Sequence, residues 1–166
     1  MSRAVHKQSD RYARKEYWEE RFTTEDEFDW LGTLKDFESQ LDLTPHSSIL
    51  LLGCGSSTLS DELTRRGHFV ISTDYSSVVC HKQKERHSSY EFTVADCQAP
   101  IHRKSFDLVI EKGVIDALVG IGFIRFTQLV VQLSTIMSQK NFTVKENETW
   151  KKPEIIPGHY RRAQSH

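Results

Sequence analysis

Apolar and polar positions alternate along this chain in blocks that predict a parallel sheet with helices between its strands. A run of apolar residues occupies 49–52 and is closed by Gly53, which is typical of a strand buried on both faces. Three more strands are predicted over 69–71, 90–95 and 106–110, with helices over 56–66 and 76–86. This alternation predicts an α/β fold, a doubly wound sheet with right-handed crossovers.

Segments of different character flank this core and divide the chain into three parts. Residues 1–45 are predicted to form a helical arm, residues 46–144 the α/β domain, and residues 145–166 a disordered polar tail. The arm contains predicted helices over 12–22 and 33–41, and the end of the domain a helix over 124–137 and a strand over 141–144. With 166 residues, 37% of them hydrophobic, one globular domain is expected.

Charge and composition limit the kinds of molecule that the chain is expected to bind. The net charge of -1 gives no overall field that favours nucleic acid or a membrane, and no apolar run is long enough to span one. We expect a cytoplasmic protein with three reduced cysteines and no metal site, the alternative being mitochondrial targeting by the basic first fifteen residues. The basic residues Lys82, Lys84, Arg86 and His87 are interpreted as a solvated face.

The sequence Gly53-Cys54-Gly55 lies directly between a predicted strand and a predicted helix. Glycine at such a turn lets the backbone approach a ligand closely, and the start of the helix offers free N–H groups. The alternative is a tight turn with a purely structural role. A dinucleotide-binding fingerprint needs a third glycine where this chain has Thr58, which disfavours a nicotinamide cofactor.

Acidic residues end the following strands at the same edge of the predicted sheet. Asp74 is placed to accept hydrogen bonds from two ribose hydroxyls, the alternative being a cap of the next helix. Asp96 ends the third strand, where an acid can receive an adenine amino group, and Glu111 ends the fourth. Because ligands of open α/β sheets bind outside the carboxyl ends of the strands, these positions predict a ligand site there.

Five motifs occur in the order YWEERF, FDWL, LLLGCGSSTLS, TDYSSVV and FDLVIEKGVIDAL. Together they resemble the eukaryotic methyltransferase-like family that includes elongation-factor lysine methyltransferases and the citrate synthase lysine methyltransferase. The resemblance covers residues 12–118. It implies the Rossmann-like, seven-strand fold of class I S-adenosylmethionine-dependent methyltransferases.

The resemblance also implies S-adenosyl-L-methionine as the cofactor and a lysine-bearing protein as the substrate. It places Gly53 and Gly55 under the methionine end, Asp74 on the ribose, Asp96 and Cys97 near the adenine, and Trp30 over the site, with Cys54 and Tyr75 completing the cofactor-binding set. Glu111 would face the sulfonium and hold the neutral substrate amine as the catalytic candidate. Related enzymes often have an acid two positions before the turn, where this chain has Leu51.

The family pattern continues beyond the Asp-Ala-Leu motif with further strands that this sequence matches poorly. Residues 138–144 are the single candidate for the next turn and strand. We therefore expect a sheet that lacks the last strands and a partner that covers its open edge. Two functions remain open: an active protein-lysine methyltransferase, or a shortened non-catalytic variant that binds the cofactor weakly or acts through a partner.

Overall fold

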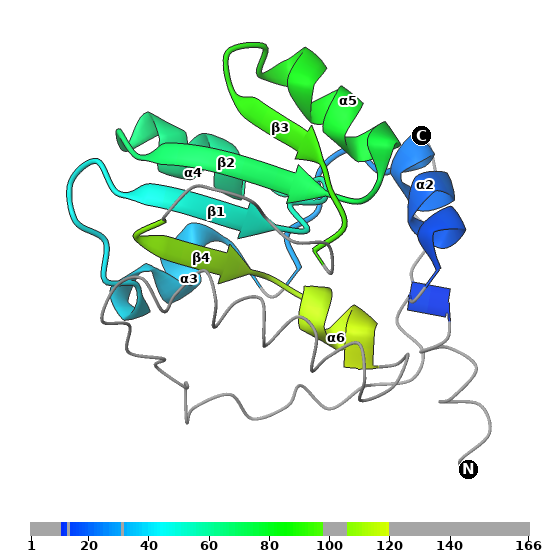
Figure 1. The fold of residues 1–166 in the computed structure, drawn as a ribbon, viewed down its shortest axis with the longest axis horizontal. Helices are drawn as coiled ribbons and strands as arrows, with labels where there is room; N and C mark the ends of the chain where they lie inside the picture. The colour runs from blue at the N-terminus through cyan, green and yellow to red at the C-terminus, as the bar shows by residue number, and fades with distance from the viewer. Residues whose placement is uncertain (1–10, 13, 31, 98–105, 120–166) are drawn as a thin grey trace, which may run out of the picture.

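A computed structural model describes residues 11–12, 14–30, 32–97 and 106–119. Its sheet has four parallel strands in the order β3-β2-β1-β4, with bounds β1 (Ser48–Leu52), β2 (Phe69–Asp74), β3 (Glu91–Val94) and β4 (Leu108–Glu111) (Figure 1). The central position belongs to β1, whose Leu50 pairs with Ile71 on one side and Val109 on the other. The predicted Rossmann-like α/β fold is confirmed for these residues.

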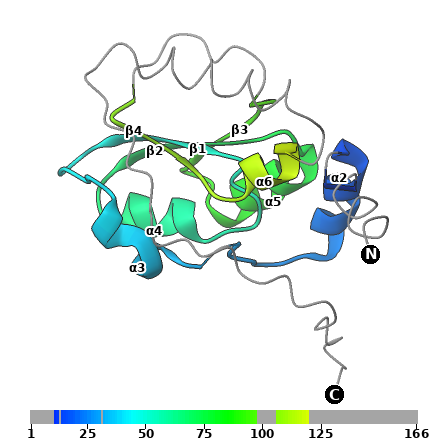
Figure 2. The same cartoon turned by 90° about the horizontal axis from the view of Figure 1, so that it is seen from below.

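The helices are α2 (Lys15–Thr24), α3 (Leu34–Phe37), α4 (Leu59–Arg65), α5 (Ser77–Arg86) and α6 (Val114–Val119), with a 3-10 turn η1 (Glu38–Gln40) after α3. Helices α3, α4 and α5 lie over one face of the sheet (Figure 2). Helix α2 packs against α5 at the edge where the strands end (Figure 1). The arm therefore lies beside the carboxyl ends of the strands.

Buried apolar side chains on both faces of β1 explain its continuous apolar run. Its residues 49–52 are between 0% and 2% exposed. One face packs against Leu34, Leu59 and Leu63, and the other against Phe106 and Leu118. The side chains of β1 therefore belong to the apolar layers on both faces of the sheet.

Local hydrogen bonds set element ends that differ from the predicted ones. The helix predicted over 56–66 begins at Leu59, because the Ser57 hydroxyl accepts from the Leu59 N–H at 3.1 Å and holds a turn before it. The helix predicted over 33–41 is divided between α3 and η1 and begins with a capping box of Thr33 and Asp36. Helix α6, directly after β4, was not predicted.

Some predicted features lie outside the described residues: the helix over 124–137, the strand over 141–144 and the polar tail. Within the described part of the chain, no helix has the length and apolar character needed to cross a membrane. Among the same residues, no three His, Cys, Asp or Glu side chains are gathered as metal ligands would be. The three cysteines form no disulfide.

Candidate functional site

The turn after β1 has glycine at two positions, which share a left-handed backbone but differ in their surroundings. Gly53 and Gly55 have φ values of 61° and 52°, in the left-handed region that favours glycine. A Cβ at Gly53 would overlap the Val114 side chain of α6, whereas one at Gly55 would lie 3.7 Å from the Phe22 ring. Gly53 is therefore fixed by packing inside the protein, and Gly55 faces the arm.

Asp74 ends β2 and its carboxylate lies against this turn. Its Oδ2 accepts from the Gly55 N–H at 3.0 Å, and its Oδ1 accepts from the Ser76 N–H at 2.9 Å. Burial raises the pKa of Asp74, although these hydrogen bonds oppose the shift. The N-cap of α5 is Ser76, whose hydroxyl accepts from the Val79 N–H, so Asp74 links the turn to the helix start without being the cap.

Other predicted residues gather beside Asp74. Burial, with the charges of Asp74 and Asp96, raises the pKa of the half-buried Tyr75. Burial, with the charges of Asp96, Asp74 and Glu111, raises the pKa of Cys97 to about 12. The residues predicted for ribose and adenine therefore lie together at the carboxyl edge of the sheet.

Cys54 presents its side chain to the core instead of the ligand side of the turn. It packs with the buried residues beneath the sheet. A hydrogen bond with the Cys80 thiol, together with burial, raises the pKa of Cys54. The backbone N–H of Cys54 donates to the Thr73 carbonyl at 2.9 Å and fixes the turn to β2.

Aromatic side chains of the arm cover the turn and the end of β4. The buried Phe22 contacts Gly55, and Trp18 stacks on Phe22 with ring centroids 5.6 Å apart. Trp30 lies against Gly113, where a Cβ would be 2.6 Å from its ring. Trp30 therefore lies beside the end of β4, while its role in closing a cofactor site stays a prediction. Trp18 and Phe22 were not predicted as site residues.

The guanidinium of Arg21 lies among these rings. It is 5.3 Å from the ring centroid of Trp18, 5.2 Å from that of Phe28 and 6.0 Å from that of Trp30. Its Nε donates to Glu25 Oε2 at 2.5 Å. Its buried Nη1 has no hydrogen-bond partner among the described residues. Such a donor favours an anionic group as its partner.

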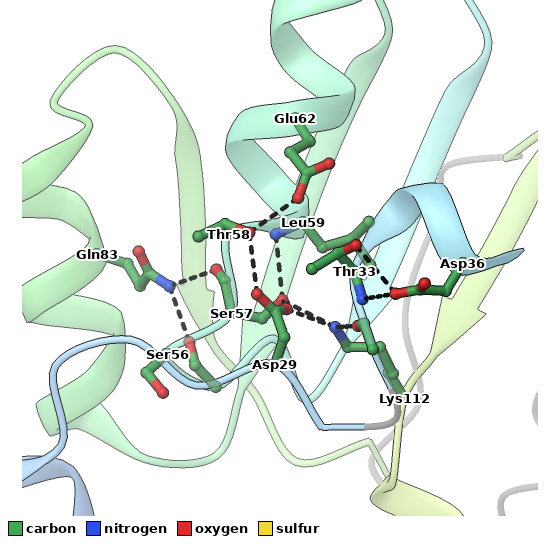
Figure 3. A network of polar contacts seen from close by, with 12 residues as sticks. Asp29, Thr33, Asp36, Ser56, Ser57, Thr58, Leu59, Glu62, Gln83 and Lys112 are labelled. Carbon is green, nitrogen blue, oxygen red and sulfur yellow. Dashed lines mark hydrogen bonds and ion pairs between the residues drawn. The ribbon is translucent and has the colours of Figure 1, made fainter. Parts of the chain in front are cut away.

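Asp29 joins the arm, the turn and β4 in one polar network (Figure 3). Its Oδ1 accepts from the Lys112 ammonium at 2.5 Å and from the Ser57 hydroxyl, and its Oδ2 accepts from the Thr58 hydroxyl at 3.0 Å. Lys112 also donates to the Gly32 carbonyl at 2.8 Å. Partial burial favours the neutral acid, but the hydrogen bonds from Lys112 and Ser57 outweigh it and lower the pKa of Asp29.

Comparison with known proteins supplies the family of this site. Residues 50–122 match a protein family described as "Methyltransferase domain". The EEF1A lysine methyltransferase 4 of Mus musculus is 35% identical over 119 residues, which cover 66% of this chain and 47% of that protein. The chain belongs to the class I S-adenosylmethionine-dependent methyltransferase family. The cofactor of this family is S-adenosylmethionine.

Two further proteins show how far the likeness to methyltransferases extends. The eEF1A lysine and N-terminal methyltransferase of Homo sapiens is 31% identical over 122 residues, covering 68% of this chain and 18% of that protein. The structure of magnesium protoporphyrin IX methyltransferase from Synechocystis PCC 6803 is similar to this chain with a TM-score of 0.51 at 18% sequence identity. The similarity covers 62% of this chain and 50% of that protein, and it supports the fold. This chain spans about half the length of the EEF1A lysine methyltransferase 4.

Glu111, the catalytic candidate predicted from the sequence, lies where β4 ends. Its Oε2 accepts from the Ile115 N–H at 3.0 Å in the first turn of α6. The residue therefore contributes to the start of a helix as well as to the edge of the sheet. Lys112, next to it, was not predicted as a site residue, although the Glu-Lys pair was visible at a strand end.

Glu19 fixes the arm to the start of α5. Its carboxylate accepts from the Ser76 hydroxyl at 2.8 Å, the Ser77 N–H at 3.1 Å, the Ser77 hydroxyl at 3.2 Å and the Val78 N–H at 3.1 Å. The first N–H groups of a helix lack partners within it, and a negative charge there is favourable. Sequence reasoning missed Glu19, because it is one of several acids on a charged helix.

Two members of the basic face expected to be solvated on α5 also contact the arm. Lys82 donates to the Thr23 carbonyl at 2.9 Å, and Arg86 forms an ion pair with Asp26 at 3.5 Å. The acidic linker after α2 lies along α5, so these cations bind the arm. Attachment of the arm to α5 thus continues beyond Glu19.

Glu19→Gln is expected to lower the free energy of unfolding by about 1 kcal/mol at neutral pH, the size of a helix-capping interaction. Partial burial alone would raise the pKa of Glu19, but hydrogen bonds from Ser76, Ser77 and Val78 lower it. A lowered folded-state pKa means that this stability is complete above the ordinary glutamate value of about 4.3 and is lost as the pH falls through the folded value. Urea unfolding at a series of pH values measures it, and an equal difference in strong acid would contradict the assignment.

Proposed function

We propose that this chain binds S-adenosylmethionine at the turn after β1 and transfers its methyl group to a lysine of a protein. One observation carries the proposal: the N–H of Gly55, a left-handed glycine, is held by Asp74 at the end of the neighbouring strand. This is the edge at which open α/β sheets bind their ligands. Membership of the methyltransferase family supports the same ligand.

The residues around the turn fit the chemical groups of the cofactor. Asp74 offers carboxylate oxygens to ribose hydroxyls, and Asp96 offers an acceptor to the adenine amino group. Arg21 Nη1, which lacks a partner among the described residues, suits the methionine carboxylate. The ribose, the adenine and the methionine carboxylate of the cofactor thus each have a candidate partner on this edge.

The chemistry asks the protein for binding and orientation. S-adenosylmethionine supplies a methyl group that is already activated by the sulfonium. The arm rings exclude water from the turn, and the site must hold an uncharged amine in line at short distance. No nucleophilic side chain is needed in the chain itself.

A protein lysine is proposed as the acceptor because the relatives named above act, by their names, on elongation factor eEF1A lysines. Both relatives are methyltransferases, so they give no support to the alternative of a non-catalytic variant. Elongation factor eEF1A is therefore the first candidate substrate. A cytoplasmic location is proposed with it, as the compartment of translation.

Transfer of tritium from methyl-labelled S-adenosylmethionine to purified eEF1A tests the function. We expect labelling that requires this chain and that mass spectrometry places on a lysine. Prior acetylation of the eEF1A lysines, which removes the nucleophilic amines, should abolish it, and Asp74→Ala in the enzyme should abolish it for native eEF1A. If the unmodified chain binds the cofactor but labels neither eEF1A nor any protein of a eukaryotic lysate, the transferase proposal is wrong.

Glu111→Ala is expected to lower the rate of methyl transfer about tenfold while leaving cofactor affinity within about twofold, as loss of one charge-assisted hydrogen bond to the acceptor amine would do. Single-turnover labelling and calorimetric titration with S-adenosylmethionine separate the two effects. Glu62→Ala, on α4, is the matched acid control. Unchanged transfer by the Glu111 variant would remove Glu111 from the catalytic site.

A further inference from the structure

The rings that cover the turn belong to a separate segment of the chain and need to be held in place. Trp18 and Phe22 lie one helical turn apart on α2, and Phe22 contacts Gly55. Their position over the turn therefore depends on how α2 is docked. Helical propensity alone contributes little to the stability of α2, because isolated helices of 10 residues are only marginally stable in water.

Docking of α2 is concentrated at Glu19, the residue after Trp18. Its two carboxylate oxygens accept four hydrogen bonds from Ser76, Ser77 and Val78 at the start of α5. This set includes two N–H groups that precede the internal hydrogen bonds of α5. A neutral amide in place of the carboxylate would lose the favourable charge at the helix start and one of the two acceptor oxygens.

The same helix α5 also holds the cofactor turn. The Gln83 side-chain amide donates to the Gly55 and Ser57 carbonyls, each at 3.0 Å. At its other end α5 begins three residues after Asp74, whose carboxylate accepts from the N–H of the N-cap residue Ser76. Glu19 thus attaches the arm to the helix that positions both the turn and the predicted ribose acid.

We propose that Glu19 is a positioning residue for cofactor binding, which acts by docking α2 on α5 so that Phe22, with Trp18 stacked on it, lies beside Gly55. The inference rests on the proposed cofactor site and adds a residue that does not touch the cofactor. The second attachment of the arm, by Lys82 and Arg86, lies at the last residues of α2 and in the linker after it. Loss of Glu19 therefore releases the middle of α2, where Trp18 lies, while the linker stays bound.

Calorimetric titration of the full chain with S-adenosylhomocysteine tests the inference. Glu19→Gln is expected to weaken binding about tenfold, which corresponds to about 1.4 kcal/mol. Glu20→Gln, on the exposed side of the same helix, should change affinity less than about twofold. Thermal unfolding of each variant in the same buffer confirms that the folded protein is titrated.

A double-mutant cycle with Trp18→Ala separates positioning from general destabilisation. If Glu19 acts through the ring, Glu19→Gln should weaken binding less than about twofold once Trp18 is alanine. An undiminished tenfold effect in that background, or unchanged affinity of Glu19→Gln alone, would overturn the inference. Failure of the unmodified chain to bind would instead overturn the proposed function, and this inference with it.

Discussion

Asp74→Ala is expected to weaken the binding of S-adenosylmethionine by more than a hundredfold. In the proposed complex the carboxylate accepts hydrogen bonds from two ribose hydroxyls, and hydrogen bonds to a charged group contribute about 1.5–3 kcal/mol each. The variant also releases the Gly55 N–H, which Asp74 holds at 3.0 Å, so the turn loses its anchor on β2. Calorimetric titration measures the change directly.

The fold itself should survive this substitution. Burial raises the pKa of Asp74, so the charged carboxylate costs stability once the pH rises through the folded value. Removing that charge at pH 7 offsets part of the two lost backbone contacts, and we expect a stability change below about 2 kcal/mol. A matched control is Asp107→Asn at the amino end of β4, where Oδ2 accepts from the Ser48 N–H at 2.8 Å. The Asp107→Asn variant should bind S-adenosylmethionine as tightly as the unmodified chain does. If Asp74→Ala binds it equally tightly, the proposed site is wrong.

Gly53→Ala is expected to lower the free energy of unfolding by about 2–5 kcal/mol and to abolish measurable cofactor binding. The left-handed φ of 61° costs a residue with a Cβ roughly 1–2 kcal/mol. The new methyl group would also overlap Val114 on α6, and overpacking of this kind costs about 1–3 kcal/mol. Urea unfolding gives the stability, and titration at low temperature gives the binding of the folded fraction.

Two companion variants separate strain from overlap. Gly67→Ala has a similar conformational demand, with φ at 87°, but its Cβ would lie 3.7 Å from His46, so we expect a cost of about 1 kcal/mol and normal binding. Val114→Ala should lower the free energy of unfolding less in the Gly53→Ala variant than in the unmodified chain, by at least about 1 kcal/mol. Strict additivity of the two substitutions would show that Val114 does not confine Gly53.

The sheet could be predicted from the sequence because its evidence is local. The apolar run before Gly53 is a strand buried on both faces, and Asp74 and Glu111 stand at strand ends as expected. The predicted start of a helix was wrong where a side chain changed the backbone conformation, as the Ser57 hydroxyl does before α4. Helix α6 was not predicted, because the six residues of it that the structure describes are too few to show a helical period.

The arm is the part of the site that sequence reasoning described least. The carboxylate of Glu19 binds the Ser76 hydroxyl across a separation of 57 residues, and Asp29 binds Lys112 across 83. Periodicity reports which face of a helix is apolar, but it carries no information on which distant backbone group an acid will meet. Trp18 and Phe22 were visible as an i, i+4 aromatic pair, but their contact with Gly55 depended on this docking.

Titration of the uniformly 15N-labelled chain with S-adenosylmethionine, followed by amide chemical shifts, tests most directly whether the cofactor binds at this turn. We predict saturable shifts that are largest at Gly53, Gly55 and Ser57 after β1 and at Tyr75 and Ser76 after β2, with little change at Ser48 on the opposite edge. A well-dispersed spectrum that stays unchanged at millimolar cofactor, or shifts confined to other parts of the chain, would contradict the proposed site.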